Sequence, residues 1–115
     1  MIKIFHNLEV YQRSKLLYPQ IIKATSRFSP QGFHLRDQLC RSANGIQANI
    51  AEGFGRSVSE FKMYLTRALG SCNETISHLE DAKNAELIQE KLTINLINEF
   101  TIVGKQLYRL RENWK

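Results

Sequence analysis

The sequence contains no long uninterrupted stretch of apolar residues. No run approaches the roughly 18 apolar residues that would indicate a membrane-spanning helix. Charged residues are spread through positions 1–17, which leaves no apolar core for a secretory signal peptide. These absences lead us to expect a cytoplasmic protein that has no membrane as a partner.

Cysteine, proline and glycine are also scarce. Cys40 and Cys72 lie far apart on apolar helical faces, so we interpret them as small buried side chains with free thiols. Free thiols suit a reducing cytoplasm. With two prolines and six glycines among its 115 residues, the chain lacks the frequent turn signals of a long all-β architecture.

Patterns typical of catalysis or metal binding are absent as well. His6, His34 and His78 lie on different segments and have no flanking signature. Glu74 and His78 share a helical face, but a di-iron bundle needs Glu-x-x-His on two helices. We therefore predict no catalytic residues, no metal site, no cofactor, and a protein that is not an enzyme.

The residues that are present favour one all-α domain spanning residues 1–115. Apolar content (43%) and charged content (23%) are near globular averages. Apolar residues recur at the helical period in four segments, about 8–28, 34–52, 58–83 and 89–113. Short connections make consecutive helices antiparallel neighbours, so we predict an antiparallel up-down-up-down four-helix bundle.

The stretch NIAEGFGRSVSEF contains a G-x-G that resembles part of a phosphate-binding loop. A dinucleotide-binding loop follows a strand and has a third glycine, whereas here a helix precedes and Val58 takes that place. We interpret the stretch as the turn between the second and third helices. Arg56 is the residue in this turn that could meet an anion near the helix N-terminus.

Helix end signals surround this turn. We expect Gly53 to end the second helix in a backbone conformation with positive φ. Ser57 and Glu60 have the spacing of a capping box, in which each residue satisfies a backbone N–H of the other. Asn84 is the predicted left-handed stop of the third helix.

Residues 38–74 strongly resemble the four-helix-bundle family first noted as open reading frames in intervening sequences of bacterial 23S rRNA genes. The family shows Q-L-x-R-[SA], then S-I-x-x-N-I-A-E-G, then E-F, then A-x-G-S-x-x-E. The matching residues are Gln38, Leu39, Arg41, Ser42, Ile46, Asn49, Ile50, Ala51, Glu52, Gly53, Glu60, Phe61, Ala68, Gly70, Ser71 and Glu74. The N-terminal segment is similar too, whereas Gly45 departs from a more usual serine.

This resemblance implies an all-α bundle that assembles as a homo-oligomer, specifically a homopentamer, often with a central channel. It also implies kinship with accessory proteins of diversity-generating retroelements, which associate with a reverse transcriptase and with nucleic acid. No catalytic residues are known for the family, so the resemblance implies none here.

The family motif includes four polar residues that we expect near helix ends or on helical turns facing the protein interior: Asn49, Glu52, Glu60 and Glu74. Buried or half-buried polar groups need hydrogen-bond partners. We predict that Asn49 and Glu52 hydrogen-bond across the turn that follows the second helix and fix its geometry. Together with Gly53 and Ser57, these residues form the structural motif of the chain.

The net charge of +5 is unevenly distributed along the chain. Residues 1–73 and 100–115 are basic, whereas residues 74–99 are acidic. A basic surface, repeated in an oligomer, would attract RNA or DNA through its phosphates. The candidate nucleic-acid-binding residues are Arg36, Arg41, Arg56, Lys62, Arg67, Lys105, Arg109 and Arg111.

Two functions stay open at this point. The first is a non-enzymatic nucleic-acid-binding protein or ribonucleoprotein accessory, with itself, RNA or DNA, and a reverse transcriptase as partners. The second is a protein-interaction scaffold in which the acidic segment 74–90 pairs with basic segments of other subunits, so that the charge is used in assembly.

Overall fold

Four long helices account for most of the chain, which the computed structural model describes over residues 4–115. They are α1 (Glu9–Thr25), α2 (Phe33–Gly53), α3 (Val58–Asn84) and α4 (Glu90–Asn113), and short 3-10 helices η1 (Phe5–Asn7) and η2 (Pro30–Gly32) precede α1 and α2. No strand occurs in this described part of the chain. The prediction of an all-α structure with four helices is confirmed.

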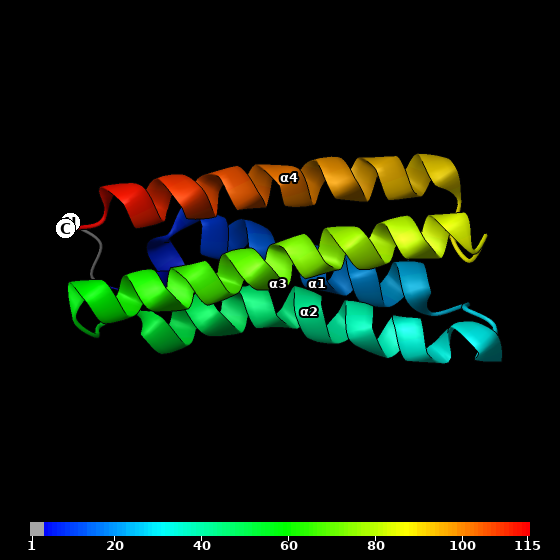
Figure 1. Cartoon of the computed structure of the whole chain (residues 1–115), viewed down its shortest axis with the longest axis horizontal. Helices are drawn as coiled ribbons and strands as arrows, with labels where there is room; N and C mark the ends of the chain where they lie inside the picture. Colours follow the sequence, from blue (N-terminus) through cyan, green and yellow to red (C-terminus); the bar gives the residue numbers. More distant parts are fainter. Residues whose placement is uncertain (1–3) are drawn as a thin grey trace.

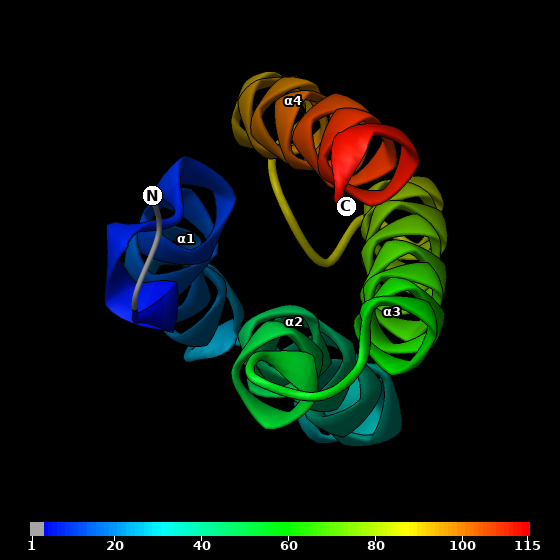
Figure 2. The same cartoon turned by 90° about the vertical axis from the view of Figure 1, so that its left-hand side faces the viewer.

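The helices pack side by side into an elongated bundle of 44 × 21 × 18 Å (Figure 1). Viewed along the bundle, α1, α2, α3 and α4 follow one another around a common axis (Figure 2). Across residues 4–115, no helix combines the length and apolar character that crossing a membrane requires.

Contacts between helices fix their register. Thr75 Oγ1 donates to Ser42 Oγ at 2.8 Å, and further along α2 Gly53 packs against Tyr64, nearer the start of α3. The partners therefore run in opposite order along α2 and α3. Contacts between α3 and α4 follow the same rule, in the pairs Phe61–Trp114, Thr66–Arg111 and Cys72–Phe100.

The core is a continuous apolar cluster to which all four helices contribute. Its largest fully buried apolar side chains are Phe61, Phe100, Ile21, Leu39, Ile46, Ile50, Leu65, Leu79, Leu107 and Val103. Most buried hydroxyls find a partner within their own helix, because Ser14, Thr25 and Thr93 each donate to the carbonyl four residues earlier, while the Thr75 hydroxyl donates to Ser42. These polar groups are therefore buried in the core with hydrogen-bond partners.

One end of the bundle carries a cluster of aromatic side chains, and we call it the aromatic end. Here η1, the α2–α3 turn and the end of α4 meet, as seen at the left of Figure 1. Phe54 and Phe61 have ring centroids 5.7 Å apart, and Trp114 lies 4.8 Å from Phe61. The ring centroid of Phe5 lies 6.3 Å from that of Phe54, so η1 packs against the α2–α3 turn. The opposite end holds the α1–α2 and α3–α4 connections.

Helix α1 ends at Thr25, whereas the sequence indicated a helix to about residue 28. The backbone N–H groups of Ser26 and Phe28 donate to Lys23 and Thr25 carbonyls, which closes turns after the helix. Phe28 is nevertheless buried, so its apolar character reflects packing of the connection rather than another helical turn.

Gly53 ends α2 as predicted, but the prediction of a positive φ at this residue is wrong. Gly53 is the last helical residue, and the positive φ of +87° belongs to Gly55. A Cβ on Gly53 would lie 2.4 Å from the Tyr64 Cβ, so close packing of α3 explains this glycine. Likewise Asn84 is helical, and Glu86 takes the positive φ of 59° after α3.

Candidate functional site

The α2–α3 turn contains the predicted capping box. Ser57 Oγ accepts from the Glu60 backbone N–H at 3.2 Å and donates to the Glu60 carboxylate at 2.8 Å. These bonds to the Ser57 hydroxyl and backbone, with the nearby Arg56 charge, lower the pKa of Glu60 from its ordinary value. The carboxylate at this helix N-terminus is therefore held in its charged form.

Arg56 spans the turn and is held by three contacts. Its Nε donates to the Glu52 carbonyl at 2.9 Å, and its Nη1 lies 3.7 Å from the Glu60 carboxylate. Its guanidinium also lies over the Tyr64 ring, 4.9 Å from the centroid. Arg67, one helical turn further along α3, lies at the same distance from that ring. Tyr64 thus contacts two of the candidate arginines, Arg56 and Arg67, beside the turn.

The predicted hydrogen bond of Asn49 across the turn is wrong. Asn49 Nδ2 instead donates to the Gly45 carbonyl of its own helix at 2.8 Å. A Cβ on Gly45 would lie 2.9 Å from Ser71 Oγ, so this glycine allows close approach of α2 and α3. Glu52 does contribute to the turn, but through its backbone carbonyl, which accepts from Arg56.

Glu74 lies away from the turn, in the middle of α3. Its Oε2 is 3.3 Å from Nε2 of His78, one turn later on the same helix. Within residues 4–115, no group of three or more His, Cys, Asp or Glu side chains could hold a metal ion. The structure therefore assigns Glu74 a local contact on α3.

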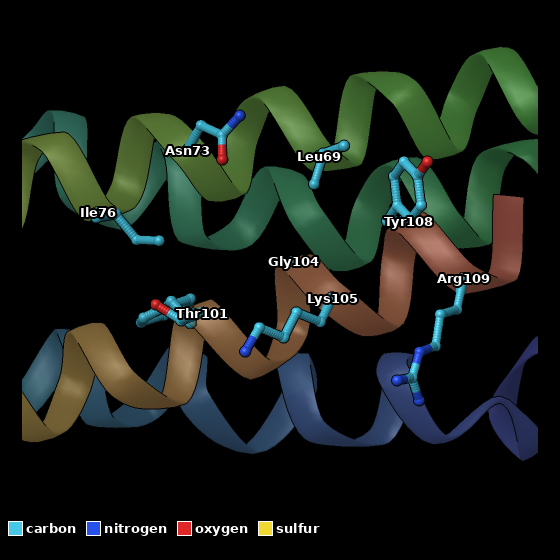
Figure 3. A pocket seen from close by; sticks show the side chains of 9 residues that line it. Leu69, Asn73, Ile76, Thr101, Gly104, Lys105, Tyr108 and Arg109 are labelled. Atoms are coloured by element: carbon cyan, nitrogen blue, oxygen red, sulfur yellow. The ribbon is translucent and has the colours of Figure 1, made fainter. Parts of the chain in front are cut away.

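The basic residues of α4 border an open groove between α3 and α4 (Figure 3). Lys105 and Arg109 are exposed there, and neither forms an ion pair in the described part of the chain. Arg111 is half-buried and bonded to Glu112 Oε2 and to Thr66 Oγ1, each at 3.2 Å. Side chains that line the groove are Leu69, Asn73, Ile76, Phe100, Thr101, Lys105, Tyr108 and Arg109.

The remaining candidate nucleic-acid-binding residues do not all lie near this groove. Arg36 is in the first turn of α2, far from the α2–α3 turn, where its guanidinium lies 4.2 Å from the Phe33 ring centroid. Its Nε is 3.8 Å from the Asp37 carboxylate. Arg41 is exposed in the first half of α2, and Lys62 is half-buried near the start of α3. Arg56, Lys62, Arg67, Lys105, Arg109 and Arg111 thus share the half of the bundle that includes the aromatic end.

The thiols are poorly placed for chemistry. Cys72 is fully buried and donates to the Phe100 carbonyl at 3.1 Å. Burial raises the pKa of Cys72 to about 11, which disfavours the reactive thiolate. Cys40 is half-buried, with its sulfur 3.8 Å from Thr25 Oγ1. Cys72 confirms the interpretation of a small buried side chain with a free thiol, whereas Cys40 has a free thiol but is only half-buried.

Two tyrosines beside the basic residues were missed by the sequence analysis. Tyr64 is buried between two arginines, whereas Tyr108 is 52% exposed beside Arg111, whose guanidinium lies 5.3 Å from its ring centroid. A signal existed in the spacing, because Tyr64–Arg67 and Tyr108–Arg111 are both i, i+3 pairs that share a helical face.

Comparison with known proteins identifies the relatives of this bundle. Residues 6–109 match the family described as 23S rRNA-intervening sequence protein. A crystal structure from Bacteroides thetaiotaomicron, described as a protein of unknown function from the S23 ribosomal protein family, is similar with a TM-score of 0.84 and 26% identity. The match covers 90% of this chain and 96% of that one. No curated protein matches the sequence. On this evidence the chain belongs to the 23S rRNA-intervening sequence protein family.

Proposed function

We propose that this chain is a non-enzymatic protein that assembles with copies of itself and binds RNA through basic side chains. The binding surface in this proposal covers the aromatic end and the adjoining half of α4. It includes Arg67, Lys105 and Arg109, while Arg36 at the opposite end makes no contribution.

The observation that carries the proposal is a set of basic side chains without local partners. Across residues 4–115, Lys62, Arg67, Lys105 and Arg109 form no ion pair. Arg67, Lys105 and Arg109 are also exposed. Unpaired surface cations can neutralise phosphates and release condensed counterions, which supplies most of non-specific affinity for nucleic acid.

Self-assembly would multiply this charge. We propose an antiparallel up-down-up-down bundle that forms a homo-oligomer, with the pentamer implied by the family resemblance as the expected state. The opposite order of contacting residues along neighbouring helices supports the antiparallel arrangement. Exposed apolar residues on α4, Leu92, Ile94 and Ile102, are available for contacts between subunits. A reverse transcriptase is a further proposed partner, by the same resemblance.

RNA binding measured over a range of salt concentrations tests the proposal. The triple variant Arg67→Gln/Lys105→Gln/Arg109→Gln should bind structured RNA more weakly and with a shallower salt dependence. The slope of log K against log salt should fall by about one for each phosphate that the variant no longer neutralises. A matched control, Lys23→Gln/Arg27→Gln/Arg36→Gln, removes the same charge near the opposite end and should have little effect. Equal weakening in both variants, or binding insensitive to salt, would contradict the proposal.

A protein-interaction scaffold is the second candidate. The exposed apolar residues of α4 and the acidic residues of α3, Glu80 and Asp81, favour it because they could pair with a second subunit. In that case the basic variants above should change the mass in solution, and the wild-type protein should not bind RNA at low salt.

A further inference from the structure

We propose that the α3–α4 groove is a stacking site for an unpaired base, so that this protein prefers single-stranded to double-stranded RNA. The inference rests on the proposed function and deepens it, because it assigns a chemical class of ligand to one part of the basic surface. Tyr108 would carry the base, and Lys105 and Arg109 would meet the neighbouring phosphates.

The first observation is an exposed aromatic ring at the groove. Tyr108 is 52% exposed and lines the groove, so its ring is accessible to a ligand. Aromatic rings exposed beside basic residues are how proteins hold unpaired bases, since every base has a face on which a ring can stack.

The second observation is that the ring is held in place. The Arg111 guanidinium lies over Tyr108, 5.3 Å from the ring centroid. Arg111 is itself fixed from two sides, by Thr66 Oγ1 on α3 and by the Glu112 carboxylate. A ring oriented before binding loses less conformational freedom when a base stacks on it. The guanidinium also adds positive charge near the site.

The third observation is the chemistry of the groove lining. Leu69 and Ile76 supply apolar surface from α3, and Gly104 of α4 presents no side chain. Asn73 offers an amide that can both donate to and accept from a base edge. No acidic side chain lines the groove, while Lys105 and Arg109 stand on its α4 side (Figure 3). Apolar surface, one amide and two cations complement a base attached to a phosphate backbone.

A duplex could not use this site in the same way. Its bases are stacked on one another and paired, so their faces are closed to Tyr108 unless the duplex is opened. A double-stranded ligand would therefore gain from Lys105 and Arg109 but not from the ring. The difference between the two ligands isolates the stacking contribution from the electrostatic one.

The experiment compares an unstructured RNA oligonucleotide with an RNA duplex, using wild type, Tyr108→Ala and Tyr108→Phe. Tyr108→Ala should weaken binding of the single strand roughly 5- to 140-fold, the equivalent of about 1–3 kcal/mol for a stacked base. Duplex binding should be unchanged, and Tyr108→Phe should bind the single strand like wild type because the ring is kept. Phe33→Ala removes another exposed ring beside an arginine, at the opposite end, and should leave both affinities unchanged.

Other outcomes would overturn the inference in recognisable ways. Equal weakening for single strand and duplex, or no weakening for either, would show that Tyr108 does not stack on a base. A change in the mass of the assembly would show that the groove is a contact between subunits. Failure of wild type to bind either RNA at low salt would instead contradict the proposed function. Circular dichroism of each variant checks that the helices are retained.

Discussion

The two ends of the bundle solve the same problem, joining two consecutive helices, in different ways. At the aromatic end, the Ser57 hydroxyl caps α3 by accepting from the Glu60 N–H and donating to the Glu60 carboxylate, and the first turn packs Phe61 among other aromatic rings. At the opposite end, α4 begins at Glu90, and its N-cap residue Gln89 makes no side-chain cap, after a connection in which Glu86 has positive φ. A side-chain helix cap and an aromatic cluster therefore occur together at the aromatic end.

The charges divide in a related way. The aromatic end and the adjoining half of α4 present Arg67, Lys105 and Arg109 without ion-pair partners in the described chain. The opposite end holds both the α3–α4 connection, with the acidic residues Glu86 and Glu90, and the α1–α2 connection, with Arg27 (Figure 1). The candidate basic residues that lack ion-pair partners are thus concentrated in the half of the bundle that carries the Ser57 cap.

The largest expected effect comes from removing the central aromatic ring. Phe61→Ala should lower the free energy of unfolding by about 3–5 kcal/mol, because Phe61 is 1% exposed and packs against Phe54 and Trp114. Ile88→Ala, in the α3–α4 connection, should cost less because Ile88 has a smaller side chain than Phe61 and is slightly less buried, at 9% exposure. Urea unfolding of both variants measures the difference. Equal destabilisation would mean that the aromatic cluster does not set the two ends apart.

A smaller effect is expected from the close approach at Gly53. Gly53→Ala should destabilise the protein by about 1–3 kcal/mol, because the new Cβ would meet the Tyr64 Cβ at 2.4 Å. Gly70→Ala is the matched control, since nothing lies within 4 Å of a Cβ there. That control should stabilise α3 by about 1 kcal/mol through helix propensity. Thermal unfolding should move the two melting temperatures in opposite directions.

The helix caps provide a reciprocal test of the two ends. Ser57→Ala should cost about 1 kcal/mol, because the Glu60 backbone N–H loses its acceptor. Gln89→Asp should stabilise α4 by up to about 1 kcal/mol, because the present residue makes no side-chain cap. Urea midpoints of the two variants should therefore shift in opposite directions. A stabilising Ser57→Ala would contradict the assigned cap.

The smallest effect is a dependence on pH. The lowered pKa of Glu60 means that its contribution to stability is present above the ordinary glutamate pKa and is lost as pH falls through the lowered value. Glu60→Gln should therefore be less stable than wild type near neutral pH, and the difference should shrink in acid. Urea midpoints at about pH 7 and about pH 3 provide the comparison. A difference that does not change with pH would contradict a role for the charged carboxylate.

Features encoded by local spacing could be predicted from the sequence. The apolar periodicity located the four helices, and the Ser57–Glu60 spacing located the cap, because both depend on neighbours a few residues away. The role of Gly53 could not be found in this way, since it depends on Tyr64 packing from another helix. Asn49 had acceptors both across the turn and within its own helix, and spacing alone does not choose between them.

The candidate site was predictable only in part for the same reason. Charge counts along the chain indicated basic segments but not which of them meet in space. Arg36 lies at the opposite end beside Asp37. In contrast, Arg67 on α3 and Lys105 on α4 belong to helices that pack against each other. Sequence charge also carries no information about exposure, which is what separates Tyr108 from the buried Tyr64.

The hydroxyl bond between Ser42 and Thr75 has a consequence for how this sequence can evolve. Ser42 Oγ can also donate to the Leu39 carbonyl at 3.2 Å, and Thr75 Oγ1 to the Ser71 carbonyl at 2.8 Å. Removal of either hydroxyl therefore leaves the other with a partner in its own helix. Each position can therefore be substituted alone without leaving the other hydroxyl buried and without a hydrogen-bond partner. Successive single substitutions can thus replace this polar contact between α2 and α3 with an apolar one.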